Sequence, residues 1–119
     1  MILIKQIYEP KAAQDGHRIF IDRTWPEGVP KSTAHIHEWL YELAPSEQLR
    51  QWLGIDSERF LSFKKYYLKE LEEKLGLLTS IFEKSKHETV TIVHSAKDDT
   101  FNYAPILLEA IENITSIND

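Results

Sequence analysis

The sequence predicts an α/β fold in which a mostly parallel sheet of about three or four strands packs against helices. Apolar and β-branched runs at residues 2–8, 17–22 and 89–93 have the composition of strands. The last of these runs has helical patterns on both sides of it in the sequence, which favours a central strand that is parallel to its neighbours. The chain has 119 residues, of which 42% are apolar, and this suits a single domain over residues 1–119.

Strands and loops alternate in the N-terminal part of the chain. We expect the first strand at Ile2–Tyr8, ended by Pro10. A turn marked by Gly16 precedes the second strand, His17–Asp22. The next segment, Arg23–Pro30, contains two prolines and a glycine, and we therefore expect a loop there.

The segment Lys31–Ser46 mixes helical and strand periodicity, and we expect it to be irregular to extended. His35 and His37 would share one face of a strand, as metal ligands can, but no third ligand is near them in the sequence. Exposed imidazoles are therefore favoured over a zinc site, and no metal-binding residue is assigned.

Three stretches have helical periodicity. The first begins at Ser46, which is a good N-cap, and ends at Gly54. The second is long, and we expect a break in it at Gly76. The last runs from about Tyr103 to Ile114, with Asn102 as its expected N-cap.

Composition excludes several classes of protein. With 14 basic and 19 acidic residues the net charge is -5, which argues against broad binding of nucleic acid through its phosphates. The chain has no cysteine, which excludes disulfides and thiolate zinc sites. No apolar run approaches the roughly 20 residues that span a bilayer. The N-terminus lacks the layout of a signal peptide. We therefore expect a cytoplasmic protein that does not bind membranes.

Polar residues gather where two predicted strands end, and ligands of open α/β sheets bind outside the carboxyl ends of the strands. The strand at residues 89–93 is followed by His94, Ser95, Lys97, Asp98 and Asn102. The strand at residues 17–22 leads into Asp22, Arg23 and Trp25.

Each of these groups has a structural interpretation beside the functional one. Arg23 suits a carboxylate or phosphate ligand, but an ion pair with Asp22 that holds the loop, anchored by Trp25, is slightly favoured on spacing alone. Arg50 lies one turn after the Ser46 cap, where it either lines a pocket or pairs with a nearby carboxylate, and pairing is the more frequent role of a single arginine.

Four groups of motifs, in order along nearly the whole chain, are Asp22–Gly28, Trp39–Ser46, Leu49–Arg50 with Trp52, and Ser95–Asp98 with Asn102 and Ala104. Together they resemble the YeaO-like DUF488 family, whose activity is unknown. The resemblance implies a small cytoplasmic α/β domain of bacterial or archaeal type. It also implies one site formed by Asp22, Arg23, Trp25, Pro26, Pro45, Ser46, Arg50, Lys97, Asp98 and Asn102.

The chain departs from the family pattern at several positions. Typical members carry Leu in place of Thr24, Arg in place of Glu27 and often Tyr in place of His94. They tend to read His-Asn-His where this chain has Phe101–Tyr103, so a mechanism that needs those imidazoles is not expected here. His94 either takes over an acid/base role or is a core residue at the end of a strand.

These residues suit an anionic small molecule. Arg23, Arg50 and Lys97 supply positive charge, together with the N-terminus of the last helix. The proton-transfer candidates are Asp22, His94 and Asp98. Trp25, Ser46 and Asn102 complete the predicted ligand-binding set. Neither Ser46 nor Ser95 lies in a Gly-x-Ser-x-Gly motif, no P-loop or dinucleotide motif is present, and no cofactor is assigned.

Two main hypotheses follow. One is a small enzyme, such as a hydrolase or transferase, acting on an anionic small molecule or nucleotide. The alternative is a non-catalytic ligand-binding or regulatory module that uses the same basic residues. Binding of single-stranded nucleic acid through Trp25 and Trp39 is a weaker third, because the net charge opposes it. The sequence does not set the oligomeric state.

Overall fold

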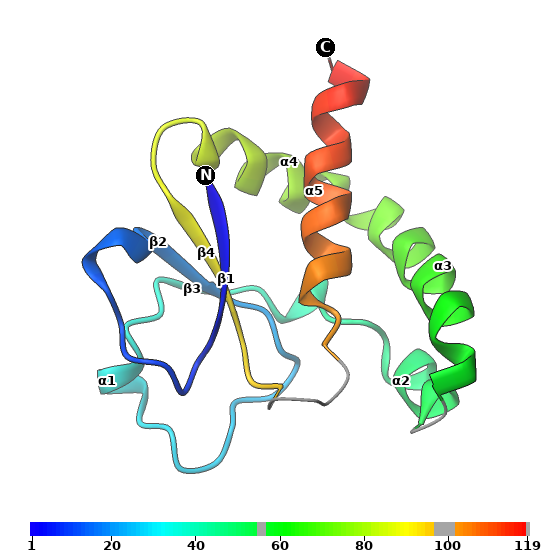
Figure 1. Ribbon diagram of the computed structural model, residues 1–119, viewed down its shortest axis with the longest axis horizontal. Coiled ribbons are helices and arrows are strands. Elements are labelled where there is room, and N and C mark those ends of the chain that lie inside the picture. Colours follow the sequence, from blue (N-terminus) through cyan, green and yellow to red (C-terminus); the bar gives the residue numbers. More distant parts are fainter. Residues whose placement is uncertain (55–56, 97–101, 119) are drawn as a thin grey trace.

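The computed structural model describes residues 1–54, 57–96 and 102–118, and it confirms the α/β fold (Figure 1). Four parallel strands form one sheet in the order β1-β4-β2-β3. Their bounds are Ile2–Gln6 for β1, His17–Phe20 for β2, Glu38–Trp39 for β3 and Val90–His94 for β4. The sheet is therefore assembled from both ends of the chain.

Strand β4 lies inside the sheet, between β1 and β2. The helical patterns on both sides of it in the sequence predicted this position. It pairs with β1 from Ile2 opposite Val90 to Gln6 opposite His94, and it pairs with β2 on its other side. All five of its residues are buried. A strand covered on both faces is expected to be apolar almost throughout, and this explains its unbroken β-branched run.

The α-helices differ in length and in the face of the sheet that they cover. Their bounds are Lys31–Ala34 for α1, Glu47–Leu53 for α2, Phe60–Leu71 for α3, Leu75–Ser85 for α4 and Ala104–Asn118 for α5. Helices α4 and α5 pack against one face of the sheet, α3 packs on α5 and α2 on α3, while α1 and the loop before it lie on the other face (Figure 1). No helix in the described ranges is long and apolar enough to cross a membrane.

Alternation along β2 and β4 separates two hydrophobic clusters. Ile19 of β2 and Ile92 of β4 face the large cluster formed with the helices. Phe20 and Val93, one residue further along, face a smaller cluster. The smaller cluster is completed by Ile7, Ala34, Trp25, Val29, Ile36 and Trp39.

Two segments differ in detail from expectation. The ambiguous stretch after Pro30 contains the four-residue α1 and the two-residue strand β3, so only a short part of it is extended. The long helix breaks at the 3-10 turn Glu72–Lys74, whereas Gly76 lies in the first turn of α4. Lys74, with φ -115 and ψ 23, leaves the helical region and separates the two axes.

A buried ion pair joins the start of β2 to the turn before it. Arg18 Nη1 lies 2.7 Å from Asp15 Oδ2, and the two side chains are only 1% and 2% exposed. Lys5 contacts the same carboxylate oxygen at 3.0 Å. Burial raises the pKa of Asp15, but hydrogen bonds from the Ala12 N–H, Lys5 and Arg18 outweigh burial and bring that pKa below its usual range.

The Arg18 guanidinium also satisfies the end of α1. Its Nη2 donates to the Ala34 carbonyl at 3.1 Å, and its Nε donates to the His35 carbonyl at 3.2 Å. His35 has φ 54, a left-handed conformation that turns the chain back toward β3. Arg18 therefore links β2, Asp15 and α1 in one set of charge-assisted hydrogen bonds.

Replacing Arg18 with methionine is expected to lower the free energy of unfolding by about 3–5 kcal/mol, because buried Asp15 loses one of its two cationic partners and two carbonyls lose their donor. Urea unfolding measures the change. The matched control is Lys64→Ala, which removes an exposed ion pair to Glu109 and is expected to cost at most about 1 kcal/mol. Equal losses in the two variants would contradict this role of Arg18.

Candidate functional site

Asp22 lies where β2 ends, beside the end of β4 and the start of α5. Its Oδ1 accepts a hydrogen bond from the Tyr103 hydroxyl at 2.7 Å. Its Oδ2 accepts hydrogen bonds from the Ser95 N–H at 3.0 Å and from the Ser95 hydroxyl. Both carboxylate oxygens are therefore engaged within the protein, and Asp22 connects three elements that are distant in sequence.

Tyr103 extends this connection toward α2. Burial raises the pKa of its phenol, and the negative charge of Asp22 and the hydrogen bond to it raise that pKa further. Tyr103 is therefore a neutral hydrogen-bond donor to Asp22. The guanidinium of Arg50 lies over its ring, 5.9 Å from the centroid. This contact brings the α2 arginine to the same end of the sheet.

Arg23 is exposed, and its partners in the described part of the chain are backbone carbonyls rather than the Asp22 carboxylate. Its Nη2 donates to the Pro45 carbonyl at 3.1 Å and lies 3.5 Å from the Ala44 carbonyl. The expected structural role for Arg23, holding its loop, is thus performed through carbonyl contacts. Its Nε and Nη1 make no hydrogen bond within the described ranges.

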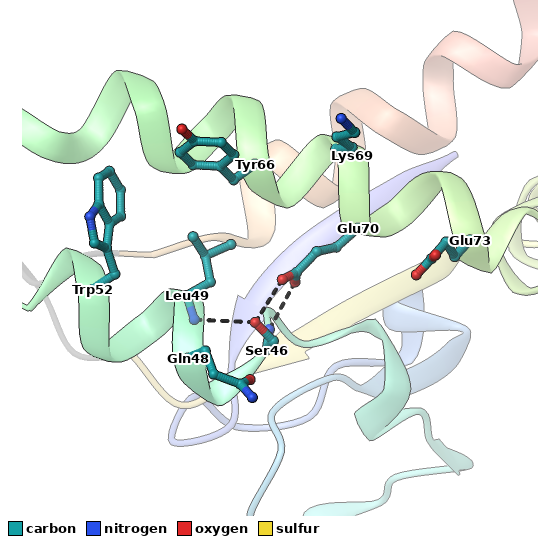
Figure 2. Close-up of a pocket in the computed structure, with 8 residues that line it drawn as sticks. All are labelled: Ser46, Gln48, Leu49, Trp52, Tyr66, Lys69, Glu70 and Glu73. Carbon is teal, nitrogen blue, oxygen red and sulfur yellow. Dashed lines mark hydrogen bonds between the residues drawn. The ribbon is translucent and has the colours of Figure 1, made fainter.

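Ser46 caps α2 as predicted, because its Oγ accepts a hydrogen bond from the Leu49 N–H at 3.2 Å. Figure 2 shows Glu70 of α3 facing it: the Ser46 N–H donates to one carboxylate oxygen at 2.9 Å and the hydroxyl to the other at 2.6 Å. The Ser46 hydroxyl is thus held between two helices. No local pattern in the sequence reveals this partner of Ser46, which lies 24 residues away.

His94 is a buried residue at the end of β4, with only 5% of its surface exposed. The Ala96 N–H donates to its Nδ1 at 3.1 Å, and its Nε2 lies 3.2 Å from the Asn102 amide nitrogen Nδ2, which is also a donor. Burial lowers the pKa of His94, although the charges of Asp22 and Glu9 act in the opposite direction. Neither nitrogen of the ring is open as a proton acceptor in this arrangement.

Asn102 lies just before α5. Its Oδ1 accepts a hydrogen bond from the Ala104 N–H at 2.9 Å, while the Tyr103 carbonyl accepts the first helical bonds. Asn102 therefore caps α5 from the residue before the N-cap position, whereas the sequence predicted it at the N-cap itself. The predicted residues Lys97 and Asp98 lie outside the described residues.

Trp25 is separate from this group. Its ring packs in the smaller hydrophobic cluster on the opposite face of the sheet, where its Nε1 donates to the Val29 carbonyl at 2.7 Å. Pro26, beside it, is half-buried. The structure thus places Asp22, Arg23, Ser46, Arg50, His94 and Asn102 at one end of the sheet and Trp25 elsewhere.

Two hollows border the group. One, of about 310 Å³, is lined by Arg23, Ser46 and Lys74 but also by Glu42, Glu70 and Glu73. The larger, of about 580 Å³, lies between α2 and α3, with Trp52 and Tyr66 at one end and Ser46 and Glu70 near its middle (Figure 2). Charges of both signs therefore surround Arg23.

The two histidines considered for zinc have other roles. His37 Nδ1 accepts a hydrogen bond from the Arg18 N–H at 3.0 Å, and its ring stacks on His17 at 5.0 Å. His37 and His35 are exposed, as expected. Within the described ranges, no group of three His, Asp or Glu residues is arranged to hold a metal ion.

Comparison with known proteins gives a consistent result. A family model described as the inactive DUF488-N3 subclade matches residues 1–119. Uncharacterized protein YeaO of Escherichia coli K12 is 31% identical over 113 residues, which cover 95% of this chain and 98% of that protein. Uncharacterized proteins Rv3073c of Mycobacterium tuberculosis and Mb3100c of Mycobacterium bovis are each 28% identical over 110 residues, covering 92% of both chains. No solved structure matches significantly.

Replacing Asp22 with alanine is expected to lower the free energy of unfolding by about 3 kcal/mol, because Tyr103 and Ser95 lose a charged acceptor. The control Ser95→Ala removes one hydroxyl but keeps the Ser95 N–H bond, and is expected to cost about 1 kcal/mol. Urea unfolding compares the two variants. A smaller loss in Asp22→Ala than in Ser95→Ala would be inconsistent with the central place of this carboxylate.

The depressed pKa of His94 predicts a pH dependence of stability. The unfolded chain protonates His94 near pH 6.5, whereas the folded protein keeps the ring neutral to lower pH. Its contribution to stability is therefore fully present above pH 6.5 and is lost as the pH falls below that value. Urea unfolding at about pH 7.5 and about pH 5.5 is expected to show a smaller loss in His94→Gln than in the wild type.

The exposed His87 provides the control for this measurement. A His87→Gln variant makes the same substitution at an exposed position and is unfolded at the same two pH values. If His94→Gln and His87→Gln change stability equally between the two pH values, the buried neutral state of His94 is excluded as the cause.

Proposed function

Since the chain belongs to the DUF488 family, in the subclade described as inactive DUF488-N3, we propose that it is a non-catalytic ligand-binding module. Its proposed ligand is a small molecule with one anionic group, bound beside Arg50 and Arg23 at the carboxyl ends of β2 and β4. The observation that carries this proposal is the engagement of both Asp22 oxygens by Tyr103 and Ser95, while the two arginines have no carboxylate partner in the described ranges.

Two of the acid/base candidates, Asp22 and His94, support a non-catalytic role. A general base must reach the proton that it abstracts with a free lone pair. Asp22 already accepts three hydrogen bonds at its two oxygens, and the two ring nitrogens of His94 face the Ala96 N–H and the Asn102 amide nitrogen. The Ser46 hydroxyl donates to Glu70 and accepts from the Leu49 N–H, contacts that hold it as the cap of α2.

The arginines support anion binding. Arg50 is exposed, and its guanidinium lies over the Tyr103 ring, 5.9 Å from the centroid. Arg23 uses Nη2 for its carbonyl contacts, so its Nε and Nη1 remain as donors for a ligand. A guanidinium edge binds carboxylate or phosphate through paired hydrogen bonds.

The negative charge around Arg23 limits the number of negative charges that the ligand can carry. Three glutamates line the hollow that Arg23 shares with Ser46, and they oppose a second or third negative charge. A monocarboxylate or a phosphate monoester therefore suits the site better than a polyphosphate such as a nucleoside triphosphate.

A thermal-shift screen with phosphate, sulfate, phosphosugars, nucleotides and carboxylates tests the proposal. A ligand at about 100 times its dissociation constant is expected to add roughly 2.7 kcal/mol of stability. This gain is expected to disappear in Arg50→Ala and to weaken in Arg23→Ala. Lys64→Ala, which removes a positive charge from α3, is expected to retain it.

Two results would count against the proposal. The absence of any stabilising ligand, with Arg23→Ala less stable in buffer alone, would make the arginine contacts purely structural. A bound ligand that the wild type converts to product, with turnover lost in Asp22→Asn, would replace the binding module with an enzyme.

A further inference from the structure

Two tryptophan rings converge on one ammonium group on the face of the sheet opposite α2 to α5. The rings of Trp25 and Trp39 lie 5.6 Å apart at 68°. Lys31 Nζ lies 5.6 Å from the centroid of the first and 5.5 Å from the centroid of the second. Cations bind over tryptophan faces within about 6 Å of the ring centroid.

The two rings are held in place before any ligand arrives. Trp25 Nε1 donates to the Val29 carbonyl at 2.7 Å, and Trp39 Nε1 donates to the Asp22 carbonyl at 2.7 Å. Buried Phe20 packs against both rings from below, at 5.0 Å and 6.1 Å. The arrangement is therefore a rigid aromatic corner rather than two mobile surface side chains.

The corner borders a hollow of about 170 Å³ that is lined by Trp25, Lys31, Ile36, His37, Glu38 and Trp39. The two tryptophans are half-buried, so part of each ring remains accessible. Glu38 places a carboxylate at the rim, where it also contacts His17 at 2.7 Å. Aromatic faces and a carboxylate both favour a positively charged ligand.

We infer that this corner, here called the tryptophan cage and formed by Trp25 and Trp39, is a binding site for a small quaternary ammonium compound. The Lys31 ammonium occupies it as an internal substitute. Lys31 is exposed and its primary ammonium is strongly hydrated, so it gains little from the rings. An alkylated ammonium loses less hydration and benefits more from the same two faces.

This inference does not depend on the proposed anion site. The cage lies on the other face of the sheet and uses neither Arg23 nor Arg50. Loss of anion binding therefore leaves it unaffected, and the two proposals are tested with different ligands and different variants.

The experiment is an NMR titration of the indole N–H signals with choline and with tetramethylammonium. The proteins are the wild type, Lys31→Ala, and Lys65→Ala as a matched control that removes an exposed lysine from α3. In Lys31→Ala the signals of Trp25 and Trp39 are expected to shift, with a dissociation constant roughly ten times lower than in the wild type or in Lys65→Ala. Trp52, between α2 and α3, is expected to stay unchanged.

The neutral analogue 3,3-dimethylbutanol separates cation binding from simple apolar binding. It has the shape of choline without the charge, and it is expected to bind Lys31→Ala at least about ten times more weakly. Equal binding of choline and the neutral analogue would overturn the inference, as would folded Lys31→Ala protein that binds choline no more tightly than the wild type. A trimethyl-lysine peptide as a further titrant distinguishes a protein side chain from a free metabolite as the source of the ammonium group.

Discussion

The end of the sheet depends on the carboxylate of Asp22. Its side chain holds Ser95 after β4 and Tyr103 before α5, and its backbone carbonyl accepts the indole N–H of Trp39 on the other face. One residue therefore supports the proposed arginine site through Tyr103 and fixes one wall of the proposed tryptophan cage. Both oxygens of this carboxylate accept hydrogen bonds that organise its neighbours.

Positive charge in this protein is balanced by carbonyl groups as well as by carboxylates. Arg18 donates to two carbonyls at the end of α1, and Arg23 donates to the carbonyl of Pro45. A charged donor to a carbonyl forms a stronger hydrogen bond than a neutral donor does. The irregular segments between β2 and α2 thus acquire a fixed shape without long helices or strands.

Patterns among neighbouring residues predicted some features of the structure and missed others. The β-branched run of β4, the Ser46 cap and the central position of β4 follow from neighbouring residues, and the predicted family is confirmed by a match over the whole chain. The buried Arg18 and the partner of Ser46 were missed, because burial of a charge and contacts across 24 residues leave no periodic signal. Trp25 was grouped with Arg23 because they are close in sequence, yet the loop after β2 places Trp25 in the smaller hydrophobic cluster and Arg23 against the Pro45 carbonyl.

The strand order β1-β4-β2-β3 also sets the timing of folding. Ile2 pairs with Val90. Strands β1 and β2 are therefore synthesised early, but β4, the strand that lies between them, is made only in the last third of the chain. The contacts that close the sheet span most of the sequence, and contacts of this kind form slowly. During synthesis the edges of β1 and β2 stay open to other chains, and protection of a nascent chain by chaperones matters most until β4 inserts.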